Sequence, residues 1–274
     1  MASVMTSIRG LNVHYQIINP QAEKTLVFLH GFTGSTKTWD SVIQSFQDTY
    51  RIITIDLIGH GLTDAPFNVQ RYSMEEQVEI LHDFFKARKI PSFTLIGYSM
   101  GGRVAIAFTM KYVDMVEQLI LESSSPGLPT SEERAARRKS DHLLADRIEK
   151  DGVESFTDHW ENIPLFDSQK GLPAPTKQAI RKERLEQREI GLANSLRGMG
   201  TGHQPSYWEE LQSFTKPVLL ITGELDRKFE EKASAMNKRF QCCKNVIVEN
   251  VGHAIHVENP QTFATIIEEH LEII

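Results

Sequence analysis

"TLIGYSMGGRVAIAF" (residues 94–108) joins a short apolar run to an apolar-periodic segment, and Ser99 stands between two glycines at the junction. The first run has the length of a buried strand, and the second has the spacing of a helix. In a G-x-S-x-G turn between a strand and a helix, the serine hydroxyl stands above the carboxyl edge of the sheet, where glycines leave room for a crowded backbone. Ser99 is therefore either a nucleophile or a small residue in an ordinary connection, and the rest of the chain has to decide.

Short runs rich in Val, Ile and Leu alternate along the chain with amphipathic segments of helical length. The expected strands are residues 25–30, 51–56, 93–98, 117–123, 217–223 and 245–250, and the expected helices include 73–89, 100–112, 229–240 and 260–273. This alternation predicts an α/β fold with a mostly parallel sheet flanked by helices. Residues 8–18 are expected to add an antiparallel hairpin or strand at the sheet edge.

Residues 130–212 interrupt this alternation, because they contain no strand-like run and have a charged, helical pattern broken by prolines. Eight of the fifteen arginines of the chain lie in this segment. We predict that residues 130–212 form a helical lid inserted into a core made of residues 1–129 and 213–274.

The composition favours a small-molecule ligand. The chain has 274 residues, a net charge of −6 and no Lys/Arg-rich run of the kind that follows a phosphate backbone, which argues against nucleic acid. It lacks an apolar stretch of membrane-spanning length and a secretory apolar region at its beginning. The adjacent Cys242 and Cys243 suit neither a disulfide framework nor a metal site. We expect a cytoplasmic protein that needs no metal or organic cofactor.

A catalytic serine needs a base and the base needs an orienting acid, in the chain order Ser-Asp-His when they stand at the ends of successive strands. Asp226 follows the expected strand 217–223, and His253 follows 245–250. Both positions lead to the same sheet edge as Ser99. Taken singly, Asp226 could be an ordinary loop carboxylate and His253 an ordinary turn histidine. The placement of both at strand ends beside Ser99 favours a Ser99–Asp226–His253 triad.

Three further histidines have structural interpretations. His256 competes with His253 as the base, but His253 directly follows Gly252 at the tighter turn. His30 and His60 lie in Gly-rich loops, where an imidazole can hydrogen-bond backbone groups and hold the loop. The loop "HGFTG" has a separate role, because the backbone amides of Phe32 and Met100 are expected to form an oxyanion hole beside Ser99.

The HGF loop, the D-x-x-G-H-G loop, "GYSMGGR" and the placement of the Asp and His resemble the α/β-hydrolase superfamily over essentially the whole chain. This resemblance implies an α/β-hydrolase fold. It does not choose the reaction, because the superfamily includes ester hydrolases, C–C bond hydrolases, lyases and hormone receptors.

Finer motifs resemble the 2-succinyl-6-hydroxy-2,4-cyclohexadiene-1-carboxylate synthase family of menaquinone biosynthesis. They are "GYSMGGR", "SPGLPTSEERAARRKSD" (125–141), "FTDHW" (156–160), "GLANSLRGMGTGHQPSYWEEL" (191–211) and "GELDRKF" (223–229). The resemblance implies a lyase that eliminates pyruvate from 2-succinyl-5-enolpyruvyl-6-hydroxy-3-cyclohexene-1-carboxylate. By matching position it also implies the substrate-binding residues Tyr98, Arg103, Arg137, Trp160 and Arg184.

Arginine suits a substrate with several carboxylates, because its planar guanidinium is permanently charged and donates two parallel hydrogen bonds. From spacing alone, however, Arg134, Arg137 and Arg138 share one helix face, and Arg181, Arg184 and Arg188 share another; such runs are usually solvated or paired with Glu. Two other functions stay open: a serine ester or C–C bond hydrolase with the same triad, and a noncatalytic receptor that senses a ligand in the pocket.

Overall fold

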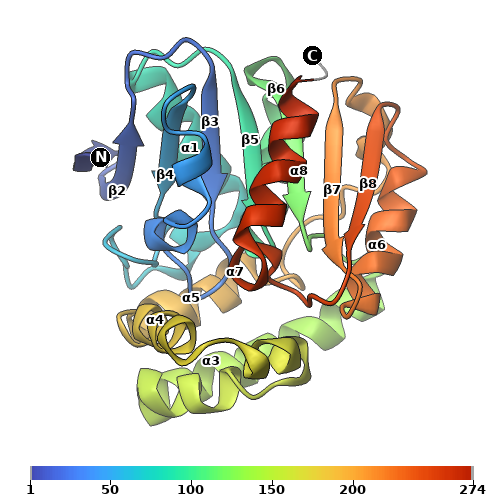
Figure 1. The fold of residues 1–274 in the computed structure, drawn as a ribbon. Helices are drawn as coiled ribbons and strands as arrows, with labels where there is room; N and C mark the ends of the chain where they lie inside the picture. Colours follow the sequence, from blue (N-terminus) through green and yellow to red (C-terminus); the bar gives the residue numbers. More distant parts are fainter. Residues whose placement is uncertain (1, 273–274) are drawn as a thin grey trace.

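The computed structural model describes residues 2–272, which are built around an eight-stranded sheet with the order β1-β2-β4-β3-β5-β6-β7-β8 (Figure 1). The strands are β1 (Ala2–Ile8), β2 (Leu11–Ile18), β3 (Thr25–Leu29), β4 (Arg51–Ile55), β5 (Phe93–Tyr98), β6 (Val116–Glu122), β7 (Val218–Gly223) and β8 (Cys243–Val248). Strands β3 to β8 pair in parallel, whereas β1 with β2 and β2 with β4 are antiparallel. The predicted mostly parallel α/β sheet is confirmed.

Two strand boundaries differ from those expected at the sheet edges. β8 begins at Cys243 rather than at residue 245, and its first residues are partly exposed, because an edge strand buries one side only. The edge hairpin begins before residue 8, since β1 covers Ala2–Ile8. Its turn has positive φ at Arg9 (51°) and Gly10 (75°), the backbone that a two-residue hairpin favours because it matches the twist of the strands.

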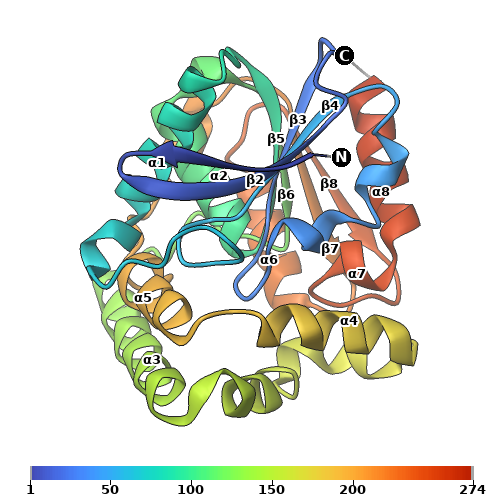
Figure 2. The ribbon, with the colours of Figure 1, turned by 90° about the vertical axis from the view of Figure 1, so that its left-hand side faces the viewer.

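Helices cover both faces of the sheet, which explains why its central strands are continuous apolar runs (Figure 2). Helices α1 (Met74–Ala87), α2 (Met100–Lys111) and α6 (Arg227–Asn237) contribute to one apolar cluster. Helix α8 (Pro260–Glu272) and the short helices η1 (Thr36–Trp39) and η2 (Ile43–Ser45) contribute to the cluster on the other face. The two layers hold the sheet from both sides.

The segment predicted as the lid lies across the carboxyl edge of the strands and contains only helices (Figure 1). They are α3 (Ser131–Trp160), η5 (Pro164–Gly171), α4 (Ala174–Leu185), α5 (Glu189–Met199) and η6 (Glu210–Ser213). α3 is interrupted at Gly152, whose φ is 83°. Because α4 ends at Leu185, Arg188 does not share the α4 face with Arg181 and Arg184; it donates instead to the carbonyls of Gly61 and Thr63 in the core.

The remaining described helices are the short α7 (Ile255–Glu258), η3 (Val69–Tyr72) and η4 (Val113–Met115). Within residues 2–272, none of the helices combines the length and the apolar character that a membrane span requires.

Candidate active site

Ser99 occupies a strained turn between β5 and α2. Its φ of 49° and ψ of −103° lie outside the regions that L-residues normally adopt. The turn is possible because the residues two positions before and after Ser99 have no side chains: a Cβ at Gly97 would lie 2.6 Å from the Gly101 carbonyl oxygen, and one at Gly101 would collide with the Leu29 carbonyl. The motif glycines therefore allow α2 to start directly against the sheet.

Three side chains from three strand ends meet at this turn. The Nε2 atom of His253 lies 3.1 Å from Ser99 Oγ, and its Nδ1 lies 2.6 Å from Asp226 Oδ2. Asp226 and His253 are 7% and 1% exposed, so their hydrogen bond is shielded from water. Because an ionised carboxylate only accepts hydrogen bonds, it places the ring proton on Nδ1 and leaves Nε2 to accept the serine proton.

The backbone amides of Met100, which follows Ser99, and of Phe32, in the loop after β3, have no acceptor in the part of the chain that the structure describes. Neither Phe32 N nor Met100 N donates a hydrogen bond to any residue between 2 and 272. Met100 is the first residue of α2, where the helix leaves its amide groups unpaired and carries a partial positive charge. Amides in this state are suited to stabilise negative charge on an oxygen.

His30 and His60 hold the loops behind Phe32. His30 Nε2 accepts from Leu57 N at 3.0 Å and its Nδ1 donates to Gly31 O at 2.7 Å, while His60 Nδ1 lies 3.1 Å from Ile58 O. Burial, and secondly the neighbouring His30, lower the pKa of His60 to about 3. Burial likewise lowers the pKa of His30. Both rings are therefore neutral at physiological pH.

The sequence interpretation missed a second carboxylate beside the triad. Glu122, at the end of β6, is fully buried, and its oxygens lie 2.8 Å from His256 Nδ1 and 3.1 Å from His256 N. The His256 ring packs against Tyr98 at 4.5 Å between centroids, and Tyr98 in turn packs against His253. The available signal was a carboxylate directly after the apolar run of residues 119–121, because a carboxylate at the buried end of a central strand needs a buried partner.

A cavity of about 460 Å³ lies between helix α4 and the loop after β3, and none of the three triad residues lines it. Gly31, Phe32, Tyr98, His256 and Arg184 line it, together with residues of α4. Tyr98, which precedes Ser99 in the chain and packs against His253, lines the cavity, but Ser99 itself does not. Aromatic side chains lie on the triad itself: the ring centroids of Phe229 and Phe166 are 4.7 and 6.2 Å from that of His253.

Arg184 reaches into this cavity from α4. It is only 6% exposed, its guanidinium stacks on the Phe166 ring at 4.9 Å, and it makes no ion pair with any described carboxylate. Burial lowers its pKa. By contrast, its neighbour Arg181 pairs with Asp158 and Glu161 at the surface. Arg184 is thus a desolvated cation without a counter-ion among the described residues, unlike the ion-paired Arg181 of the same helix.

Arg103 and Arg137 form a second cationic position, apart from Arg184, and neither of them lines the 460 Å³ cavity. Arg103 donates to Met199 O at 2.7 Å and to the side chain of Gln204 at 2.8 Å, and Arg137 pairs with Asp141 at 2.7 Å. Burial, followed by the charge of Arg137, lowers the pKa of Arg103 to about 10. Gln204 was not identified from the sequence, where no pattern marks an amide as the partner of Arg103.

Trp160, the last residue of α3, packs against Phe32 in the loop after β3. Its ring centroid lies 5.5 Å from that of Phe32, 5.4 Å from Phe156 and 6.0 Å from Phe166. Its indole Nε1 is buried and has no hydrogen-bond partner among the described residues. A buried donor in this state is available to a ligand.

In the described part of the chain, no cluster of His, Cys, Asp and Glu is arranged to hold a metal ion.

Comparisons with known proteins agree with this geometry. The family described as the alpha/beta hydrolase fold matches residues 24–260. A Bacillus subtilis (strain 168) protein assigned as 2-succinyl-6-hydroxy-2,4-cyclohexadiene-1-carboxylate synthase is 47% identical, over 92% of this chain and 92% of its own length. The synthase of that name from Salmonella agona (strain SL483) is 33% identical over 86% and 89%. The structure of MenH from S. aureus superposes with a TM-score of 0.90, 36% identity and coverage of 94% and 97%.

Replacing Glu122 tests whether the buried Glu122–His256 pair stabilises the folded protein. Glu122→Ala leaves His256 N and Nδ1 without acceptors, and we expect the free energy of unfolding to fall by about 3–5 kcal/mol. Glu122→Gln keeps one acceptor oxygen and is expected to lose less. Urea denaturation followed by fluorescence measures both, and equal stabilities of all three proteins would refute the assigned role.

The neutral buried His60 makes stability depend on pH. Its pKa is about 3 in the folded protein against 6.5 ordinarily, so below pH 6.5 the unfolded chain binds a proton that the folded chain rejects. The contribution of neutral His60 to the free energy of unfolding is therefore fully present above pH 6.5. Below that pH it falls by roughly 1.4 kcal/mol per pH unit. Urea unfolding between pH 7.5 and 5 should show a shallower slope for His60→Asn, which keeps a donor for Ile58 O. An unchanged slope would exclude His60 as a source.

Proposed function

The chain belongs to the 2-succinyl-6-hydroxy-2,4-cyclohexadiene-1-carboxylate synthase family within the α/β-hydrolase fold, and from this membership we propose that it is a lyase of menaquinone biosynthesis. Its substrate is 2-succinyl-5-enolpyruvyl-6-hydroxy-3-cyclohexene-1-carboxylate, from which it eliminates pyruvate. The observation that carries the proposal is the Ser99–His253–Asp226 arrangement together with two cationic positions. Arg184 is buried without an ion-pair partner among the described residues, and the partly buried Arg103 and Arg137 have one ion pair between them, that of Arg137 with Asp141.

The triad supplies the base. His253, with its Nδ1 proton held by Asp226, takes the Ser99 proton on Nε2. The Ser99 alkoxide then removes a proton from the ring carbon beside the succinyl ketone, so the serine acts as a base and forms no acyl-enzyme. The electron pair of that C–H bond moves into the ring and the bond to the enolpyruvyl oxygen breaks. Enolpyruvate leaves and is protonated to pyruvate.

The oxyanion amides stabilise the charge that this step creates. As the proton leaves, negative charge develops on the ketone oxygen, and the free amides of Phe32 and Met100 are the donors we assign to it. Preorganised donors of this kind lower the barrier because they need no reorientation during the reaction. The N-terminal end of α2 adds its partial positive charge.

Two separate cationic positions match a substrate with three carboxylates. Arg184, beside Tyr98 in the 460 Å³ cavity, binds one carboxylate, and Arg103 with Arg137 binds another; the partnerless indole N–H of Trp160 is a further donor. An anion between Arg103 and Arg137 relieves their mutual repulsion. The lid helices α3 and α4 supply Arg137, Trp160 and Arg184, so closure of the lid assembles the pocket and excludes water from the alkoxide.

The direct test supplies the enolpyruvyl substrate and follows pyruvate with a coupled dehydrogenase. We expect rapid release that Ser99→Ala slows by about 10²–10⁴-fold, because it removes the general base. The exposed serine of the lid, in Ser140→Ala, provides a matched control that should retain full activity. A folded protein that does not accelerate release overturns the lyase assignment. A quenched reaction that shows acyl-Ser99 by mass spectrometry would point to a hydrolase instead.

The arginines should differ in importance according to their surroundings. Arg184 is buried without a counter-ion among the described residues. We therefore expect Arg184→Ala to weaken transition-state binding by about 2–5 kcal/mol, which lowers kcat/KM roughly 30- to 5,000-fold. Arg137 is 42% exposed at its side chain and already pairs with Asp141, so Arg137→Ala should cost less. Steady-state kinetics with Arg184→Lys as the charge-retaining control measure the difference. Wild-type kcat/KM in Arg184→Ala would remove this residue from the binding site.

A further inference from the structure

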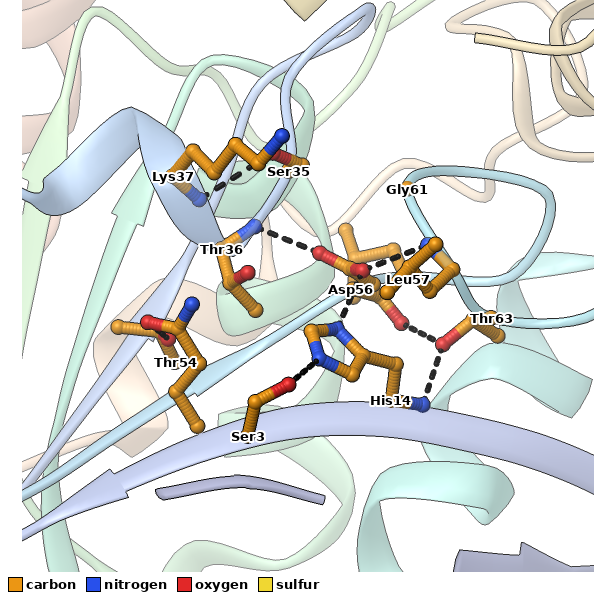
Figure 3. Close-up of polar contacts among 12 residues, drawn as sticks. Ser3, His14, Ser35, Thr36, Lys37, Thr54, Asp56, Leu57, Gly61 and Thr63 are labelled. Carbon is orange, nitrogen blue, oxygen red and sulfur yellow. Dashed lines mark hydrogen bonds and ion pairs between the residues drawn. The ribbon is translucent and has the colours of Figure 1, made fainter. Parts of the chain in front are cut away.

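A second serine–histidine–aspartate arrangement lies in the edge hairpin, apart from Ser99 (Figure 3). Ser3 Oγ on β1 is 2.8 Å from His14 Nε2 on β2, and His14 Nδ1 is 2.7 Å from Asp56 Oδ2 in the loop after β4. The corresponding distances in the Ser99 triad are 3.1 and 2.6 Å. The two constellations therefore have closely similar hydrogen-bond distances and the same order of atoms.

The hydrogen bonds of Asp56 determine the direction of the proton. Its carboxyl group also accepts from Thr36 N at 2.6 Å and from Leu62 N at 2.8 Å. Burial opposes ionisation of Asp56, but the hydrogen bond from His14, the nearby His30 and the Leu62 amide outweigh burial and lower the pKa of Asp56. An ionised Asp56 can only accept, so the His14 proton resides on Nδ1. Nε2 is then an acceptor, and the Ser3 hydroxyl donates to it.

The base is shielded while the hydroxyl is accessible. His14 and Asp56 are 4% and 1% exposed, whereas Ser3 is an exposed residue. A cavity of about 150 Å³ opens beside them, with Ser3, His14 and Gln16 in its wall. Gln16 is the cross-strand partner of Ser3, which brings a side-chain amide donor next to the hydroxyl. The volume admits only a small group.

A structural role explains why Asp56, His14 and Thr63 form this cluster, but it does not explain the presence of Ser3. Asp56 anchors the loops through Thr36 N and Leu62 N, and the hydroxyl of Thr63 bridges His14 N and Asp56 O. These contacts hold buried backbone groups. Among residues 2–272, the Ser3 hydroxyl satisfies no buried backbone group, and its one hydrogen bond is to the His14 imidazole. Loss of this hydroxyl should therefore leave the fold intact.

We propose that Ser3 is a second, activated nucleophile, which accepts short acyl groups such as acetyl from activated esters or thioesters. His14 Nε2 takes the hydroxyl proton while Ser3 Oγ bonds to the acyl carbon, and the amide of Gln16 donates to the developing oxyanion. The bond from the acyl carbon to the leaving oxygen or sulfur then breaks. The leaving group takes the proton from His14, and the product is O-acyl-Ser3.

The test uses the full chain carrying Ser99→Ala, so that the first triad cannot react, with p-nitrophenyl acetate as the probe. We expect release of nitrophenolate together with an acetyl group on the Ser3 peptide in the mass spectrum. Ser7 is a matched internal control, because it is another exposed serine on β1 and has no imidazole bonded to it. Ser3 should be acetylated about 100-fold faster than Ser7, the effect of a positioned general base.

Two added variants separate activation from exposure. Ser3→Ala should abolish the acetylated peptide, and in the chain with Ser99 intact it should leave pyruvate release unchanged, so this proposal can fail independently of the lyase assignment. In His14→Asn, the shorter amide can donate to Asp56 in place of Nδ1 but offers no base to Ser3. We expect it to slow acetylation of Ser3 about 100-fold with little change in Tm. Equal acetylation of Ser3 and Ser7, or an unchanged rate in a folded His14→Asn protein, would overturn the proposal.

Discussion

The positive-φ backbone at Ser99 is the constraint on which the candidate site depends. A residue in this conformation costs about 1–3 kcal/mol, and it persists only where the surrounding packing holds it. Here β5 lies between β3 and β6, and α2 starts one residue after the turn against the glycines on either side. The same geometry raises the hydroxyl to the carboxyl edge and leaves Met100 N without an acceptor. One local strain therefore positions both the proposed base and part of the oxyanion hole.

Three buried imidazole–carboxylate pairs occur among residues 2–272, and they show that the pair alone does not define a function. His253 with Asp226, His256 with Glu122 and His14 with Asp56 all have the carboxylate within 2.6–2.8 Å of Nδ1. In each, the acceptor-only carboxylate fixes the ring tautomer. What lies at Nε2 differs. His253 and His14 have a serine hydroxyl there, whereas His256 lines the 460 Å³ cavity and its Nε2 has no hydrogen bond to any described residue. The surroundings of Nε2 decide what each ring can do.

Sequence reasoning succeeded where one local pattern carries the information. Alternating apolar runs indicated the parallel strands, and the positions of Asp226 and His253 after two of them placed these residues at one edge, where the structure joins them to Ser99. It was incomplete where a contact links distant segments. Glu122 needs His256 from 134 positions away, and Gln204 reaches Arg103 across the sheet-to-lid boundary. The strand β1 was missed because an exposed edge strand of Ser, Thr and Met lacks the apolar run that marks a buried strand.

The lid arginines connect the electrostatics of the site to its ligand. The chain as a whole is acidic, with a net charge of −6, yet Arg184 is buried with no carboxylate partner and Arg103 lies close enough to Arg137 for its pKa to fall. Burying a cation without a counter-ion is unfavourable, and two cations side by side add repulsion. An anionic ligand removes both costs, whereas a neutral ester removes neither. Arg137 and Arg184 lie on helices α3 and α4, whereas Arg103 lies on the core helix α2. A polycarboxylate bound as we propose therefore links the predicted lid to the core, so that its charges would favour the closed arrangement.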